Sequence, residues 1–267
     1  MSLIQMPPFS PISDEDWNYY LSFQSPLYYF KSVAKDLEEK NRFFTDFRFQ
    51  KLLYWCAESK EFQGFSKYAL FKGKILYRAR VYEKDRDDEL KTSLFEGYGP
   101  KGSFIPPSKE FVTDGRINPK RIVYLYCAES PSTAIAEISP LLKTEISVAE
   151  IQIIEPINII SFCKLMNISS GKNDLVSKWR RELFIAFTEI FNHSYANSIN
   201  YLLCQYISEF YKINGYDGIA FRSSRVEMDH LQENKNICYT IFNYDKCVPV
   251  SSKLYYIFGH VYKYKSI

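Results

Sequence analysis

The segment Pro119–Ile138 constrains the fold more than any other, because it joins a short apolar run to a helix start. Residues Ile122–Ala128 are mostly apolar, with β-branched and aromatic side chains, which predicts a buried strand. Ser130 followed by Pro131 is typical of a helix start, because the serine hydroxyl accepts an orphan backbone N–H and proline lacks a donor that would have had no partner. We therefore expect a strand followed directly by a short helix, which Pro140 ends.

A carboxylate in the last turn of this helix needs an explanation. Glu137 lies where the helix macrodipole disfavours a negative charge. It is either a solvated residue on the outer face of the helix or a catalytic residue. This segment alone does not decide between the two.

Composition excludes several classes of protein. With 267 residues and 46% hydrophobic content, the chain can bury a large core, so it is not a disordered protein. A net charge of +3 without a long run of like charges gives no indication of direct nucleic-acid binding. Six cysteines without a CxxC pair and three isolated histidines suggest neither a metal site nor a disulfide framework. We expect no membrane span or signal segment, and hence a cytoplasmic protein.

Residues 1–73 differ in character from the rest of the chain. Ser13-Asp14-Glu15-Asp16 predicts a capped helix start, apolar residues recur at helical spacing after Pro26, and a third helical pattern runs from about Phe44 to Cys56. We predict a small helical N-terminal region over residues 1–73 and a second domain over residues 74–267.

The pattern changes to a period of two after Lys74. The run Ile75–Tyr82 predicts a strand that carries Arg78 and Arg80 on one face. The long segment 83–120 that follows is rich in glycine and proline, and loops of this length in compact domains are usually functional or disordered. Its last turn brings a third arginine, Arg116, to the start of the central strand.

The rest of the chain alternates between strand and helix patterns. We expect strands at 145–154, 157–162, 237–242 and 254–261, a turn and strand over 217–225, and two helices within 172–213, the second capped by Gly215. These elements predict an α+β fold with a mixed, partly antiparallel β-sheet and flanking helices.

Five motifs in this order resemble the RES-domain family, which is named for its Arg, Glu and Ser and comprises toxins of toxin–antitoxin pairs. They are YRAR (77–80), GRINP (115–119), YCAESPSTAIAE (126–137), GIAFRSSR (218–225) and NICYTIF (236–242). The resemblance covers about residues 74–262, and the N-terminal region is similar to the helical extension of some longer members. It implies an ADP-ribosyltransferase-like fold.

The resemblance also implies which residues form the catalytic site. The family's Arg, Glu and Ser fall on Arg78, Glu137 and Ser223, although Ser224 leaves a one-position ambiguity. The aromatic residue of the central strand falls on Tyr126, with Tyr124 on the same face of that strand.

The turn motif of the family falls on Gly115 and Arg116. The tryptophan that usually follows is Ile117 in this chain, which puts the packing of the turn in question more than the chemistry.

The activity that the resemblance implies is cleavage of the nicotinamide–ribose bond of NAD+, with NAD+ as a substrate and no cofactor or metal. We expect an NAD+ phosphorylase that uses inorganic phosphate as co-substrate and yields ADP-ribose 1''-phosphate. An NAD+ hydrolase and a protein ADP-ribosyltransferase on the same site stay open. The implied partner is a cognate antitoxin with a helix-turn-helix domain, and homo-oligomer formation is also left open.

These residue types suit that reaction. Nicotinamide leaves as a neutral molecule, so the barrier lies in the positive charge that grows on the ribosyl carbon. A fixed Glu137 carboxylate would stabilise that charge and bind a ribose hydroxyl. Arg78 and Arg116 could bind the diphosphate through charge-assisted bonds. Tyr126 could stack on nicotinamide, and Ser223 could orient the adjacent ribose.

Two other classes of function are weaker alternatives. Arg225 and His230 fit an Arg-x4-His pattern of HEPN-type ribonucleases, but they follow the serine motif instead of lying in a helical region. A non-catalytic module that binds a phosphorylated ligand gains support only from the departure at Ile117.

Overall fold

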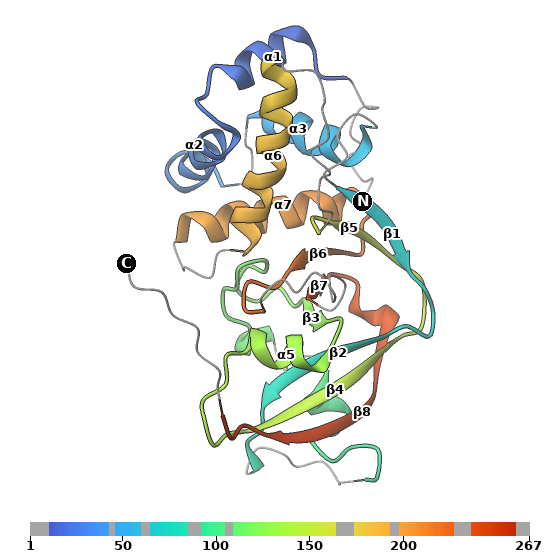
Figure 1. Ribbon diagram of the computed structural model, residues 1–267. Coiled ribbons are helices and arrows are strands. Elements are labelled where there is room, and N and C mark those ends of the chain that lie inside the picture. The colour runs from blue at the N-terminus through green and yellow to red at the C-terminus, as the bar shows by residue number, and fades with distance from the viewer. Residues whose placement is uncertain are drawn as a thin grey trace. The chain divides into compact units, whose positions relative to one another are not determined.

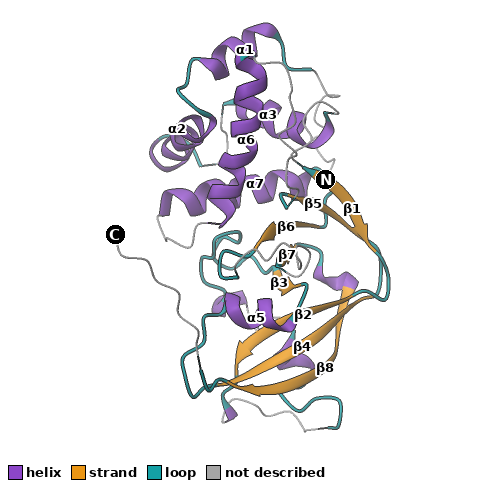
Figure 2. Cartoon of the chain, in the orientation of Figure 1, coloured by secondary structure: helices purple, strands orange, loops and turns teal. Residues whose placement is uncertain are grey.

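A computed structural model describes residues 11–42, 46–59, 65–84, 92–104, 109–163, 174–192, 198–226 and 236–259. The chain forms two compact units, and neither is continuous in sequence. Unit 1 comprises Met1–Tyr68, Asp114–Lys120 and Asn158–Arg222, and unit 2 comprises Ala69–Thr113, Arg121–Ile157 and Ser223–Ile267. Figure 1 labels the elements of both units, and Figure 2 distinguishes helices from strands.

Unit 1 is mainly helical. Its helices are α1 (Asp14–Leu21), α2 (Pro26–Glu39), α3 (Phe47–Glu58), α6 (Leu175–Asn192) and α7 (Ser198–Ile213). The strands β5 (Ile157–Ser161) and β6 (Gly218–Arg222) pair in parallel. Ser13 caps α1 in a reciprocal capping box with Asp16, as the sequence predicted. Gly215 follows α7 with a φ of 87°, in the left-handed conformation expected of a C-terminal cap.

The core of unit 1 joins the N-terminal helices to α6 and α7. Tyr20 of α1 stacks on Trp179 of α6, with the ring centroids 5.6 Å apart. Phe30 of α2 meets Phe187 edge-on at 4.8 Å, and both side chains are fully buried. Such aromatic pairs stabilise a core beyond the area they bury. The division of the chain between residues 73 and 74 stays a prediction.

Unit 2 contains an antiparallel sheet in the order β7-β3-β2-β4-β8. The strands are β2 (Ile75–Val81), β3 (Leu125–Ala128), β4 (Glu145–Ile153), β7 (Ile237–Ile241) and β8 (Cys247–Tyr256). The helices are α4 (Pro100–Ser103) and α5 (Pro131–Glu137), and short 3-10 helices lie at Lys109–Phe111 and Tyr244–Lys246. The strand β1 (Ser66–Leu70) spans the boundary between the units.

Helix α5 covers one face of this sheet, and Figure 1 shows it beside β2 and β3. Ala134 of α5 packs with Ala79 of β2, Ala128 of β3 and Val148 of β4. Since successive side chains of a strand point to opposite faces, Arg78 and its neighbour Arg80 project from the other face.

The predicted fold class is confirmed. Strand pairing is parallel in unit 1 and antiparallel in unit 2, helices flank the strands, and three helices precede them. Two predicted strands start at other residues than expected, and one strand was not predicted. β3 begins at Leu125 and not at Ile122, and β1 lies inside the region predicted to be helical.

The last strand begins at Cys247, seven residues before the predicted start. Its first half contains Pro249, and proline interrupts most strands. In the structure Pro249 pairs with Ile151, where the register shifts between Glu150 and Ile151. A bulge of this kind accommodates a residue that lacks an N–H.

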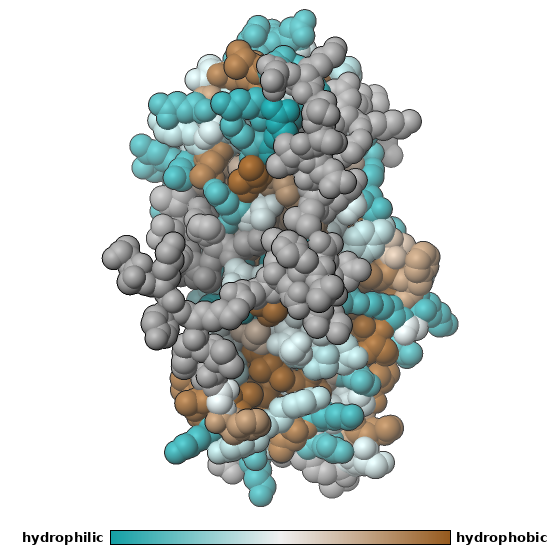
Figure 3. Space-filling model, in the orientation of Figure 1, coloured by the Kyte–Doolittle hydropathy of each residue, from teal (hydrophilic) through white to brown (hydrophobic). Residues whose placement is uncertain are grey.

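The face of the molecule seen in Figure 3 mixes hydrophilic side chains with hydrophobic patches. Exposed apolar side chains of unit 2 include Leu141 and Phe258. Among the described helices, none has the length and apolar character needed to cross a membrane.

Candidate active site

Glu137 lies in the last turn of α5, as predicted, and is its last residue, and its side chain is half-buried. The helix starts where the sequence indicated, because the Ser130 hydroxyl accepts a hydrogen bond from the backbone N–H of Thr133 at 3.2 Å. Ile138 is the C-terminal cap, and Ser139 turns the chain with a φ of 45°. The local sequence therefore fixes the carboxylate at a helix end.

Ser223 accounts for the position of this carboxylate. Its hydroxyl donates a hydrogen bond to Oε1 of Glu137, and its oxygen accepts one from the backbone N–H of Arg225 at 3.1 Å. The backbone N–H of Ser223 donates to the carbonyl of Asn236 at 2.8 Å, which fixes the segment that carries the hydroxyl. Ser223 is buried and Ser224 is exposed. The geometry thus favours Ser223 over Ser224 as the partner of Glu137.

Arg78 lies in the middle of β2 on the face opposite α5. Its Nη1 donates to the backbone carbonyl of Tyr126 at 3.3 Å, and its Nε finds no hydrogen-bond partner among the described residues. Burial lowers the pKa of Arg78 to about 10, and the nearby charge of Arg80 acts in the same direction. The guanidinium remains charged at neutral pH. Burial raises the pKa of the buried Cys127 thiol, and the positive charge of Arg78 partly offsets that rise.

Tyr126 projects from the other face of the sheet. It shares that face with Ala128, which packs against α5, and its pairing partner on β7 is Thr240. The structure therefore brings Glu137 and Ser223 into contact and places Tyr126 on the α5 side of the sheet. Arg78 reaches the backbone of β3 from the opposite side.

Arg116 belongs to unit 1, whereas the other four predicted site residues belong to unit 2. Its Nη1 donates to the carbonyl of Phe191 in the last turn of α6, where the helix macrodipole favours a cation. Gln205 of α7 donates to the carbonyls of Gly115 and Asn118 at 2.8 and 3.2 Å and fixes the turn. A role for Arg116 in binding substrate stays a prediction.

Ile117 fills the position where the family usually has tryptophan, and its side chain is fully buried. The turn is therefore packed even though isoleucine replaces the usual tryptophan.

Sequence reasoning missed a polar cluster at the junction between β3 and α5. Glu129 accepts hydrogen bonds from the ammonium of Lys74 and, at 2.9 Å, from the hydroxyl of Tyr239. The backbone N–H of Glu129 also donates to the carbonyl of Ile237 at 2.9 Å. A charged residue between a buried strand and a capped helix was a signal in the sequence, but its partners are distant in sequence and no local pattern indicates them.

Thr240 was also missed. Its side chain is fully buried, and its hydroxyl oxygen has no hydrogen-bond partner among the described residues. An alternating strand pattern does not distinguish such a hydroxyl from ordinary core packing.

Among the described residues, no three His, Cys, Asp or Glu side chains lie close enough together to bind a metal ion. All six cysteines are buried and free, and burial raises the pKa of the Cys163 thiol to about 11. A buried thiol of this kind is a poor nucleophile at neutral pH.

One part of the ribonuclease pattern, His230, lies outside the described residues, while Arg225 is exposed next to Ser223. The structure therefore does not test this pattern.

Comparison with known families decides the classification. The family model described as the RES domain matches residues 75–255, which is more than half of the chain. The chain belongs to the RES-domain family. No curated protein matches it.

A solved structure is similar to the chain at low identity. It is the crystal structure of the M. tuberculosis MbcT–MbcA toxin–antitoxin complex, with 10% sequence identity and a TM-score of 0.37. The similarity covers 70% of this chain and 87% of the matched chain. At this distance the likeness carries no argument about function.

Proposed function

We propose that this RES-domain protein degrades NAD+ by breaking the bond between nicotinamide and ribose. The observation that carries the proposal is the hydrogen bond from the Ser223 hydroxyl to the Glu137 carboxylate. A carboxylate that is held by a buried hydroxyl at a helix end is oriented before substrate arrives. Preorganised charge of this kind is the form of catalysis that a positively charged transition state requires.

In the proposed step, the bond between C1' of the ribose and N1 of nicotinamide breaks. Its electron pair goes to N1, so the positive charge of the pyridinium ring is lost and nicotinamide leaves as a neutral molecule. Positive charge grows on C1' and on the ring oxygen of the ribose, and the carboxylate of Glu137 stabilises it. An acceptor oxygen then forms the new bond to C1', and the acceptor gives up a proton if it carried one there.

We propose inorganic phosphate as the acceptor, so that the enzyme is an NAD+ phosphorylase that yields ADP-ribose 1''-phosphate. Water or a protein side chain could take the same position, which would make the enzyme a hydrolase or a protein ADP-ribosyltransferase. Arg78 and Arg116 are the proposed diphosphate ligands, and Tyr126 is proposed to stack on nicotinamide. These roles rest on the resemblance to the family.

The proposal extends to a partner and a compartment. The RES-domain family comprises toxins of toxin–antitoxin pairs. We therefore propose a cognate antitoxin with a helix-turn-helix domain that restrains the activity. Free buried cysteines fit a reducing cytoplasm.

The test is to incubate the purified, partner-free protein with NAD+ in the presence and absence of inorganic phosphate. Chromatography follows nicotinamide release, and phosphorus NMR identifies the other product. Release that requires phosphate and gives a phosphorylated ADP-ribose establishes the phosphorylase. Release without phosphate indicates hydrolysis or transfer.

A matched pair of variants assigns the activity to the site. Glu137→Gln keeps the shape of the side chain and removes its charge, and we expect it to reduce nicotinamide release about 10²–10³-fold. Glu145→Gln removes an exposed carboxylate at the start of β4 and should leave the rate unchanged. No release by folded wild-type protein would contradict the proposal, and RNA cleavage that survives Glu137→Gln would favour the ribonuclease alternative.

A further inference from the structure

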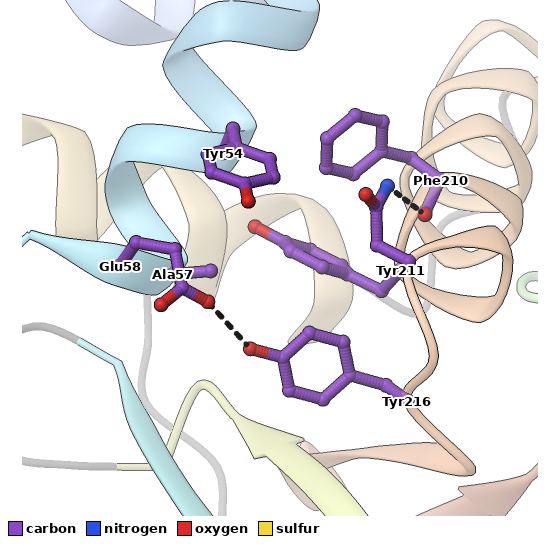
Figure 4. Close-up of a pocket in the computed structure, with 7 residues that line it drawn as sticks. Tyr54, Ala57, Glu58, Phe210, Tyr211 and Tyr216 are labelled. Carbon is purple, nitrogen blue, oxygen red and sulfur yellow. Dashed lines mark hydrogen bonds between the residues drawn. The ribbon is translucent and has the colours of Figure 1, made fainter. Parts of the chain in front are cut away.

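A charged side chain is available to a ligand when no other group already neutralises it. Among the residues that line the pocket between α3 and the C-terminal end of α7, only Glu58 is charged. Tyr216 donates to Oε1 of Glu58 at 3.3 Å, as Figure 4 shows, and Lys67 contacts Oε2 at 2.7 Å. Both oxygens of this carboxylate are therefore occupied, and the pocket offers no free charge.

Arg225 of unit 2, by contrast, is a cation without a partner. Its backbone N–H donates to the hydroxyl oxygen of Ser223 at 3.1 Å, and the same hydroxyl donates to Oε1 of Glu137. Two hydrogen bonds thus link the backbone of Arg225 to the carboxylate. The side chain of Arg225 is exposed, and among the described residues its guanidinium forms no hydrogen bond or ion pair.

The carboxylate of Glu137 is likewise not paired with a cation in the part of the chain that the structure describes, where Ser223 is its hydrogen-bond partner. Arg225 and Glu137 therefore lie close together in the fold without neutralising each other. The carboxylate stays available for the positive charge that grows on C1' of the ribose. The guanidinium stays available for an anion.

An anion has to approach this carboxylate if inorganic phosphate is the acceptor. Its oxygen must reach the carbon whose positive charge Glu137 stabilises, so the negative charges of phosphate and carboxylate come close together. Like charges repel more strongly beside a protein surface than in bulk water. A cation next to the carboxylate offsets this repulsion, and a guanidinium suits the task because it binds phosphate through two parallel hydrogen bonds.

The arginines already assigned to the diphosphate do not have this relation to the carboxylate. Arg78 projects from the face of the sheet opposite α5, and its guanidinium is bonded to a backbone carbonyl of β3. Arg116 belongs to unit 1, where it is bonded to a carbonyl in the last turn of α6. Arg225 is joined by hydrogen bonds to the pair of Ser223 and Glu137 itself.

We propose that Arg225 binds the acceptor phosphate and thereby favours phosphate over water as the acceptor. The inference rests on the NAD+ cleavage proposed above and adds the residue that selects the acceptor. A phosphate oxygen that carries no proton forms the bond to C1' as the bond between C1' and N1 of nicotinamide breaks, and the electron pair of the broken bond goes to N1. This step needs no base, so Arg225 contributes by holding the anion beside Glu137.

Initial rates of nicotinamide release at varied phosphate and varied NAD+ test the proposal on the full-length protein. In Arg225→Gln we expect KM for phosphate to rise about tenfold or more, while KM for NAD+ changes less than about twofold. Arg225→Lys keeps the charge without the two parallel donors, so its KM for phosphate should lie between those of wild type and Arg225→Gln. Lys253→Gln removes an exposed cation on β8 and should change neither constant.

The outcomes separate this inference from the proposed function. No nicotinamide release by folded wild-type protein would overturn both. Release that does not depend on phosphate would leave NAD+ cleavage standing and overturn the role of Arg225. Phosphate-dependent release with an unchanged KM for phosphate in folded Arg225→Gln would also overturn that role. A rise in KM for NAD+ alone would overturn it as well and assign Arg225 to the diphosphate of NAD+. Circular dichroism confirms that each variant is folded.

Discussion

The hydroxyl of Ser223 donates a hydrogen bond to the carboxylate of Glu137 across a sequence separation of 86 residues. The two residues come from unrelated local structures, because one ends a capped helix and the other follows a buried strand. A hydrogen bond to a charged group contributes about 1.5–3 kcal/mol, and leaving a buried partner unsatisfied costs a similar amount. This contact therefore orients the carboxylate on which the proposed chemistry depends.

The first prediction separates the two adjacent serines. Ser223→Ala should lower kcat/KM for NAD+ about 10–100-fold, because Glu137 loses the hydrogen bond that orients it. Ser224→Ala is the control, since Ser224 is exposed and should tolerate the change. Initial rates of nicotinamide release provide the measurement. Equal losses in both variants would show that the hydroxyl of Ser223 has no special part in the reaction.

Local sequence was sufficient to predict much of this site. The Ser130-Pro131 pair specified where α5 starts, and the structure has the cap that the pair implies. The alternation in β2 also predicted correctly that Arg78 and Arg80 share a face. Both features depend on neighbours within a few residues, which is why a pattern in the sequence can show them.

Local sequence patterns do not predict tertiary contacts. No local sequence pattern shows that Arg78 and α5 lie on opposite faces of the sheet. This depends on which face of the sheet packs against the helix, and in the structure it is the face with Ala79 and Ala128. Glu129 was likewise missed, since its partners Lys74 and Tyr239 are 55 and 110 residues away in sequence.

The second prediction concerns Arg78. Arg78→Lys should lower the free energy of unfolding by about 1 kcal/mol, because the bond to the carbonyl of Tyr126 is lost. If Arg78 binds the diphosphate as proposed, kcat/KM for NAD+ should also fall at least tenfold, since lysine cannot replace a bidentate guanidinium.

Arg80→Lys is the matched control, because Arg80 shares the face and donates to the carbonyl of Gly102 at 2.5 Å. Chemical denaturation and initial rates give the two quantities. A loss of stability in Arg78→Lys without a loss of kcat/KM would show that Arg78 is a structural residue only.

The third prediction addresses the cluster at the start of α5. Tyr239→Phe and Glu129→Gln should each reduce the free energy of unfolding by about 1–2 kcal/mol, because they remove the donor or the charge of one partly buried hydrogen bond. The double variant should lose less than the sum, and the difference gives the coupling energy of the pair. Tyr255→Phe on β8 is the control, since that side chain is exposed. Strictly additive losses would contradict a direct interaction.

The fourth prediction concerns the pH dependence of unit 1 and depends on Asp16. Burial alone raises the pKa of Asp16, but hydrogen bonds from Lys51 and Ser13 outweigh it and lower the pKa below the usual 3.8. The folded state thus binds the proton of Asp16 less tightly than the unfolded state. The stability that Asp16 contributes is complete above about pH 4 and is lost as the pH falls through the folded pKa.

Asp16→Asn is the variant that tests this relationship. At pH 7 it should lower the free energy of unfolding by about 1–3 kcal/mol, because the half-buried Lys51 loses its charged partner and the capping box loses an acceptor. Below pH 4 the difference between wild type and variant should shrink, since the wild-type carboxyl becomes protonated. Denaturant titrations at pH 7 and pH 3 give this difference directly. A difference that stays constant between the two pH values would show that the contribution of Asp16 comes from its shape and not from its charge.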